Sequence, residues 1–251
     1  MNSCSGLKNG KQGLVDFARI VPLSVIAICM LLGLLTGCPP ATGPSLGTNA
    51  DLEDLTLGSG SLSPVFATDT TTYAVFLTSG IGSITVTPTA ADPSAKIEVR
   101  CDGGGWAEVL SGCPCSSLTM NMGTNTVEIR VTAEDSTATK TYAITAYRGI
   151  LVPGEFATIQ AAINKPAEDG DWVLVGPNTY KENITFPTDR SLTVRSTHGA
   201  ASTTIDGGGS GSVVIFSTSS AVSELDGFTI TNGSASTTGG AEYTAVAPRR
   251  R

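Results

Sequence analysis

The 251-residue chain has little histidine, little charge and few aromatic residues: His198 is the single histidine, 15% of residues are charged and 6% are aromatic. A zinc site built on several histidines is therefore excluded, and a histidine-dependent catalytic dyad could lie only around His198. Lys and Arg number 15 against 22 Asp and Glu, which gives a net charge of −7. This sign is the opposite of what phosphate neutralisation requires, so we expect no nucleic-acid partner.

The hydrophobic content of the chain is typical of a folded protein. Hydrophobic residues make up 40% of the chain, and 29 residues are glycine. This is enough apolar surface to bury a core, which argues against disorder. The length suits about two domains of ordinary size.

The N-terminus predicts an export signal. A basic segment precedes an apolar run from Ile20 to Leu35, which is shorter than the roughly 20 residues of a membrane-spanning helix. The run ends in Leu35-Thr36-Gly37-Cys38, which resembles the lipobox of bacterial lipoproteins. The resemblance implies a signal peptide over 1–37 and a lipid on Cys38 that attaches the chain to its partner, the membrane. If the host is Gram-negative, it implies the outer membrane or the cell surface. A plain secretory signal or an uncleaved membrane anchor is the alternative.

Residues 38–50 are rich in Pro, Gly and small polar residues and predict a flexible tether. Short runs that alternate apolar and polar residues follow over 51–148, separated by turn residues, and they predict an antiparallel β-sandwich of the immunoglobulin or cadherin type. In the clearest run, Val127, Ile129 and Val131 share one face while Thr126, Glu128 and Arg130 share the other. The predicted strands are Thr72–Leu77, Ser83–Thr87, Lys96–Arg100, Asn125–Val131 and Thr141–Tyr147.

The same segment resembles the bacterial cadherin-like β-sandwich module. Its marks are Leu55-Thr-Leu57, Leu62-Ser-Pro64, Tyr73-Ala-Val75, Gly123-Thr-Asn125 and Thr141-Tyr-Ala-Ile144. The resemblance implies a spacer, adhesive or carbohydrate-contacting unit without catalysis. We expect no calcium, because the segment has no cluster of acidic and amide side chains that could supply six to eight oxygens.

Three cysteines, Cys101, Cys113 and Cys115, lie in this segment. A thiolate metal site needs four ligands, and Cys-Pro-Cys is one residue shorter than the redox Cys-x-x-Cys spacing. We therefore predict no metal and a structural disulfide from Cys101 to Cys113 or Cys115, with one thiol left over.

Residues 149–239 have a different sequence pattern from the segment before them. Pro153–Asn164 predicts one short amphipathic helix with Thr158 as N-cap and with Ile159, Ala162 and Ile163 on one face. Further β runs begin at Trp172, Ser191 and Ser212, and their near-regular spacing predicts a solenoid of stacked coils. The other predicted runs are Ile184–Phe186 and Leu225–Ile230.

This segment resembles the N-terminal cap and opening coils of a right-handed parallel β-helix of the pectin-lyase-like superfamily. The motifs are Phe156-x-Thr-Ile-Gln, Gly170-Asp-x-Val, Tyr180-x-Glu-Asn-Ile184, Thr204-Ile-Asp-Gly207 and Asp226-Gly-Phe-Thr-Ile-Thr-Asn-Gly233. The resemblance implies that the short helix caps the solenoid, and it raises the possibility of pectin-degrading chemistry by paired carboxylates. We predict no catalytic residue, because Glu182, Asp206, Glu224 and Asp226 lie at turn-like positions and His198 lies in a loop.

Residues 240–251 form an irregular tail with neither strand period nor corner residues. One hypothesis is that the reading frame is interrupted near Gly240 and the β-helix is truncated. A short native tail is the alternative.

The sequence thus predicts an all-β chain: an antiparallel sandwich followed by the start of a right-handed parallel β-helix with a short capping helix. The leading hypothesis is a lipid-anchored, non-enzymatic cell-envelope protein that binds an extracellular glycan or a cell-surface partner, without a cofactor. The alternative is a carbohydrate-active β-helix enzyme, of the pectin lyase or esterase kind, or an inactive remnant of one. A structural stalk without a ligand is a third reading.

Overall fold

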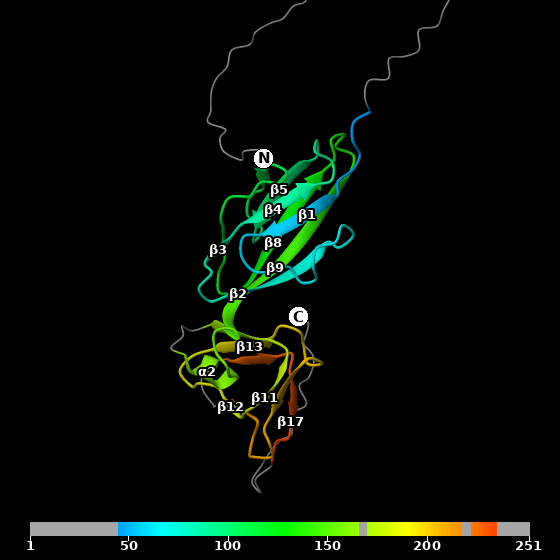
Figure 1. The fold of residues 1–251 in the computed structure, drawn as a ribbon. Coiled ribbons are helices and arrows are strands. Elements are labelled where there is room, and N and C mark those ends of the chain that lie inside the picture. Colours follow the sequence, from blue (N-terminus) through cyan, green and yellow to red (C-terminus); the bar gives the residue numbers. More distant parts are fainter. Residues whose placement is uncertain (1–44, 166–169, 217–221, 235–251) are drawn as a thin grey trace, which may run out of the picture. The chain divides into compact units, whose positions relative to one another are not determined.

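The computed structural model describes residues 45–165, 170–216 and 222–234, which fold almost entirely as β-strands (Figure 1). From Gly47 onward these residues belong to one compact unit. The predicted signal peptide, Cys38, most of the predicted tether and the predicted tail lie outside the described residues.

The main sheet of the N-terminal part has the strand order β6-β5-β8-β9, and β2 also pairs with β9. Neighbours β5, β6, β8 and β9 are antiparallel. The strands are β2 (Thr72–Thr78), β5 (Lys96–Cys101), β6 (Ala107–Val109), β8 (Gly123–Thr132) and β9 (Thr139–Val152).

Two antiparallel strand pairs complete this part. They are β1 (Leu52–Leu57) with β4 (Val86–Ala90), and β3 (Ser83–Ile84) with β7 (Leu118–Thr119). Side chains from these pairs and from the main sheet form one buried cluster, which includes Leu52, Val86, Ile129 and Tyr142. Two layers that share a core are what the sequence predicted.

Strand β8 shows why the alternation was informative. Val127, Ile129 and Val131 are fully buried, whereas Thr126, Glu128 and Arg130 lie on the accessible face. The predicted strand Ser83–Thr87 is instead two strands that belong to different sheets.

One pairing differs from the all-antiparallel prediction. β2 and β9 run parallel, from Thr72 opposite Ala143 to Thr78 opposite Gly149. Period-2 alternation reports which face a residue occupies, but it is the same in parallel and antiparallel strands. Strand direction was therefore not contained in the pattern.

The C-terminal part, which we call the parallel-strand region, begins with helix α2 (Ile159–Asn164). Thr158 is its N-cap, and Ile159, Ala162 and Ile163 are buried, as predicted. Two passes of the chain then add strands to each of three parallel pairings, and a third pass extends two of them: β10-β13-β16, β11-β14-β17 and β12-β15.

The strands of this region are short. They are β10 (Asp171–Val175), β11 (Asn178–Lys181), β12 (Ile184–Thr185), β13 (Leu192–Ser196), β14 (Thr203–Asp206), β15 (Val214–Ile215), β16 (Glu224–Asp226) and β17 (Thr229–Thr231). Between them lies a second buried cluster that includes Ile150, Val173, Ile184 and Phe228.

The predicted coil repeat is wrong for the run that begins at Ser212, which was expected to stack on the run that begins at Ser191. β10 does pair with β13, but Val214 lies opposite Ile184, and the strand beside β13 is β16. The predicted run Leu225–Ile230 is also broken at Gly227, whose φ of +80° turns the chain between β16 and β17. Only glycine adopts this backbone conformation without strain.

The 14-residue strand β9 joins the two parts. Its first half pairs with β8 and β2, and its last residues, Ile150 to Val152, pair in parallel with β10. The predicted boundary between residues 148 and 149 therefore falls inside a strand.

Candidate ligand-binding hollow

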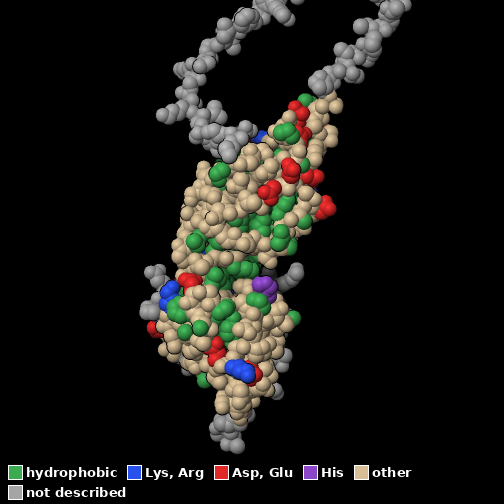
Figure 2. Space-filling view, in the orientation of Figure 1, with side chains coloured by type: hydrophobic (Ala, Val, Ile, Leu, Met, Phe, Trp, Pro, Cys, Tyr) green, Lys and Arg blue, Asp and Glu red, His purple; other side chains and the backbone are tan. Residues whose placement is uncertain are grey.

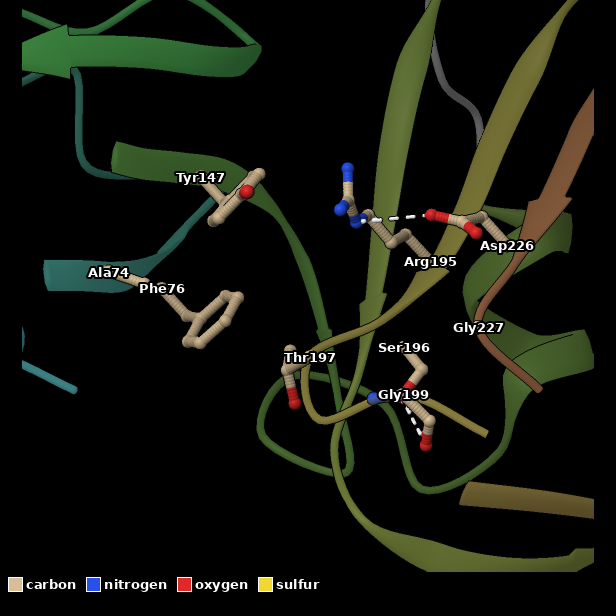
Figure 3. A pocket seen from close by; sticks show the side chains of 9 residues that line it. All are labelled: Ala74, Phe76, Tyr147, Arg195, Ser196, Thr197, Gly199, Asp226 and Gly227. Carbon is tan, nitrogen blue, oxygen red and sulfur yellow. Dashed lines mark hydrogen bonds and ion pairs between the residues drawn. The ribbon is translucent and has the colours of Figure 1, made fainter. Parts of the chain in front are cut away.

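A hollow of about 330 Å³ lies where β2 and β9 meet the strand ends of β13 and β16 (Figure 3). Figure 3 shows two chemically different sides: Phe76 and Tyr147 face the space from one side, and Arg195, Asp226 and the Ser196–Gly199 loop from the other. The lining residues are Ala74, Phe76, Tyr147, Arg195, Ser196, Thr197, Gly199, Asp226 and Gly227.

The aromatic side follows from strand register. Phe76 on β2 is directly opposite Tyr147 on β9, so both side chains stand on the same face of the sheet. Their ring centroids are 5.3 Å apart and their planes differ by 13°. This offset-parallel arrangement is a favourable one for two rings.

The polar side also follows from register. Arg195 on β13 is opposite Asp226 on β16, and Arg195 Nε lies 3.4 Å from Asp226 Oδ2. The guanidinium carbon of Arg195 is 5.1 Å from the centre of the Tyr147 ring, within cation–π range. Both charged side chains remain partly open to solvent, at 38% and 28% exposure.

Further rings extend the aromatic side into what we call the aromatic row: His198, Phe76, Tyr147 and Trp172. Trp172 stacks on Tyr147 with 6.4 Å between centroids, and His198 stacks on Phe76 at 6.2 Å. The Trp172 ring lies so close to Gly123 that a Cβ there would be 2.8 Å from its Nε1. Trp172 is therefore held against glycine backbone, which fixes that end of the row.

The loop after β13 is held by its own hydrogen bonds. Ser196 Oγ accepts from the backbone N–H groups of His198 and Gly199, and it lies 2.7 Å from Thr203 Oγ1. Thr197 Oγ1 is 2.7 Å from His198 Nδ1. The rim of the hollow is thus set by the fold before any ligand arrives.

This arrangement offers ring surface on one side and a hydrogen-bond donor beside an acceptor on the other. Ligand pockets in proteins combine apolar walls with a few placed polar groups in this way, typically at about 300–1,000 Å³. The hollow lies at the lower end of that range.

The sandwich that supplies the aromatic side has a match among known families. Residues 51–149 match the model of the cadherin-like beta sandwich domain. We call these residues the cadherin-like domain from here on.

A relative matches a part of the chain of similar length. A "Putative membrane protein" of Evansella cellulosilytica is 34% identical over 111 residues, which are 44% of this chain and 16% of that protein. The chain thus spans about a sixth of the length of the relative it matches.

The surface charge of the described residues is uneven (Figure 2), and helix α2 is short. On the face shown in Figure 2, acidic side chains gather along one side of the cadherin-like domain and basic ones are sparse. In the part of the chain that the structure describes, no helix is long and apolar enough to cross a membrane.

A second cluster of charge and ring lies on the cadherin-like domain. The guanidinium carbons of Arg100 and Arg130 lie 4.4 and 4.2 Å from the centre of the Trp106 ring, so this ring makes two cation–π contacts. Arg100 pairs with Glu128 at 2.6 Å and Arg130 with Glu98 at 2.8 Å. Hydrogen bonds from Lys96 and Arg130 lower the pKa of Glu98, and one from Arg100 lowers that of Glu128.

The cysteines of the cadherin-like domain do not pair as predicted. Cys101 and Cys115 are free thiols, and Cys113 is disulfide-bonded, so no bridge joins Cys101 to either of the others. Cys115 Sγ accepts from the Val86 N–H at 3.2 Å, and Cys101 Sγ points to the Thr119 carbonyl oxygen at 3.8 Å. The sulfur of each free cysteine therefore contacts a backbone group, and the spacing of the cysteines in the sequence did not predict these contacts.

Three of the four acidic residues that the sequence placed at turn-like positions in the parallel-strand region, Glu182, Asp206 and Asp226, are engaged in the fold. Glu182 accepts from the N–H groups of Ile159 and Gln160, both at 2.9 Å. Asp206 accepts from Gly208 N–H and Asn232 Nδ2, which lower its pKa. Glu224 is exposed on edge strand β16, and Asp226 is the partner of Arg195. Among the described residues, no group of three or more His, Cys, Asp and Glu is placed to hold a metal ion.

Phe76, Tyr147 and Arg195 were not predicted as site residues from the sequence. Each lies on a predicted strand, at a position that alternation assigns to the accessible face. An exposed aromatic residue on a strand was the available signal. Their convergence depends on the β2–β9 and β13–β16 pairings, which the pattern did not contain.

Proposed function

We propose that this chain is a lipid-anchored protein of the cell envelope that binds glycans, without catalysis. The observation that carries the proposal is the hollow, in which aromatic rings face an arginine–aspartate pair. Sugars present C–H faces that pack on rings and hydroxyls that need donors and acceptors, so this pairing of surfaces suits them.

The cadherin-like domain and the relative support an envelope location. Cadherin-like modules serve as adhesive or spacer units, and the Evansella protein is named as a membrane protein. We propose that Cys38 carries the lipid and that residues 38–50 separate the membrane from the folded part. Several acyl chains, at about 0.8 kcal/mol per buried CH₂, would hold the chain firmly.

We further propose that the parallel-strand region is the start of a right-handed parallel β-helix capped by α2. Support comes from the successive parallel pairings and from the position of α2 against β9, β10 and β12. Covering the end of such a stack with a helix would block unwanted strand pairing.

Lipidation is tested by growing cells that express the full chain with labelled palmitate. We expect label in the wild-type protein and its loss in Cys38→Ser, together with release of the variant from the membrane fraction. Cys101→Ser is the matched control and should retain the label. Labelling of Cys38→Ser at the wild-type level would contradict the anchor.

Glycan binding is tested with the detergent-solubilised full chain on an array of neutral and acidic oligosaccharides. We expect binding to at least one glycan class that survives high salt, because charge attraction is screened by salt and ring stacking is not. Absence of binding to every glycan on the array would reject the proposed function.

A further inference from the structure

We propose that the hollow binds a neutral sugar ring, and that the cadherin-like domain and the parallel-strand region each supply half of the site. This inference rests on the proposed glycan binding and names the place and class of ligand. Phe76 and Tyr147 come from β2 and β9, whereas Arg195 and Asp226 come from β13 and β16.

The polar side selects for a neutral ligand. Arg195 and Asp226 are opposite charges 3.4 Å apart, so the pair has no net charge and the guanidinium is already balanced. An acidic sugar would bring a carboxylate toward Asp226 in a chain whose net charge is already −7. A neutral sugar can instead accept from Arg195 and donate to Asp226 through neighbouring hydroxyls, and such charge-assisted hydrogen bonds are strong.

The aromatic side sets how the ring lies. The guanidinium of Arg195 lies over the Tyr147 ring, 5.1 Å from its centre, which leaves no room for a sugar between them. A sugar would therefore lie beside this pair, against Phe76 and the edge of Tyr147 (Figure 3). A ring seated there has its C–H groups against Phe76 and Tyr147 and its hydroxyls toward Arg195 and Asp226. A volume of about 330 Å³ is large enough for one sugar ring but too small to enclose a long glycan chain.

The test compares two arginines that each pair with a carboxylate and contact an aromatic ring. Arg195 pairs with Asp226 and contacts Tyr147, while Arg100 pairs with Glu128 and contacts Trp106 outside the hollow. Full-chain Arg195→Gln and Arg100→Gln are measured on arrayed neutral gluco-, manno- and galacto-oligosaccharides and on polygalacturonate. We expect Arg195→Gln to weaken neutral-glycan binding about tenfold or more, and Arg100→Gln to leave it within about twofold.

A second pair of variants guards against misfolding. Tyr147→Leu removes a ring from the hollow and should weaken neutral-glycan binding at least about fivefold, whereas Trp106→Leu removes a ring outside the hollow and should bind like the wild type. Circular dichroism of each variant verifies the fold, and Asp226→Asn replaces Arg195→Gln if the latter unfolds.

The outcomes separate this inference from the proposed function. Glycan binding that Arg195→Gln, Asp226→Asn and Tyr147→Leu all leave unchanged would overturn the hollow as the site, yet leave glycan binding standing. Preference for polygalacturonate, lost in Arg195→Gln, would overturn the neutral class. No binding to any arrayed glycan would overturn both proposals.

Discussion

Cys101 illustrates how a single side chain is set by its surroundings. It ends strand β5 and directs its sulfur to the carbonyl oxygen of Thr119. Burial first, and the nearby Asp102 charge second, raise the pKa of its thiol to about 11. The prediction paired this cysteine with Cys113 or Cys115, but its thiol is free.

We expect Cys101 to react slowly with iodoacetamide. With a thiol pKa of about 11, the reactive thiolate is roughly a thousandth of the thiol at pH 8. The labelling rate of this site, followed by mass spectrometry, should keep rising from pH 8 to about pH 10. Asp102→Asn should speed the reaction because it removes a like charge. Labelling of Cys101 as fast as an unstructured cysteine peptide at pH 8 would contradict the burial.

Helix α2 shows how distant residues complete an element. Thr158 Oγ1 accepts from Ala161 N–H, and this cap was readable from the sequence. Glu182 accepts two further N–H groups at the start of the helix, and Arg190 Nη2 donates to the Ile163 and Lys165 carbonyls at its end. A helix of six residues is unstable alone, so these partners and the buried face must hold it.

Replacing Glu182 should therefore destabilise the fold. We expect Glu182→Ala to cost about 1 kcal/mol in urea unfolding, because it leaves two backbone donors of α2 without their carboxylate. Glu224→Ala is the matched control. Glu224 is exposed and its side chain makes no hydrogen bond among the described residues, so its loss should stay within about 0.5 kcal/mol. Equal effects of the two substitutions would refute the capping role of Glu182.

At the scale of the whole molecule, the region where β9 passes from one part to the next carries several polar contacts. Glu155 Oε1 accepts from Ser79 Oγ at 2.8 Å, and Glu155 Oε2 accepts from Leu151 N–H at 2.9 Å. Arg148 donates to the carbonyl oxygens of Ser79 and Met120. These contacts tie the start of the parallel-strand region to the turn after β2.

The Glu155 contacts should make stability depend on pH. Burial would raise the pKa of Glu155, but hydrogen bonds from Leu151 and Ser79 outweigh it and lower the pKa below 4.5. Because the folded pKa is lowered, the stabilisation is complete above about pH 4.5 and is lost as the pH falls further.

Thermal unfolding between about pH 3 and 7 provides the measurement. Wild type should melt about 2–4 °C above Glu155→Gln at pH 7, a modest difference because the site is exposed, and the two should converge toward pH 3. Glu53→Gln, on the exposed face of β1, should follow the wild type throughout. A difference between wild type and Glu155→Gln that is constant across this range would contradict the ionic origin.

The sequence by itself determined features that repeat over short distances. The buried Val127, Ile129 and Val131, the Thr158 cap and the buried face of α2 all follow from a period of two or from local capping chemistry. Such features need only neighbouring residues to form, so pattern suffices to predict them.

Tertiary structure alone decided which strands meet. The parallel β2–β9 pairing, the placement of β15 beside β12 and the convergence of Tyr147, Arg195 and Asp226 join residues far apart in the chain. Those pairings depend on loop closure and on the packing of two buried cores, neither of which has a local periodic signature. The hollow is a product of that packing, and so the site emerged only from the fold.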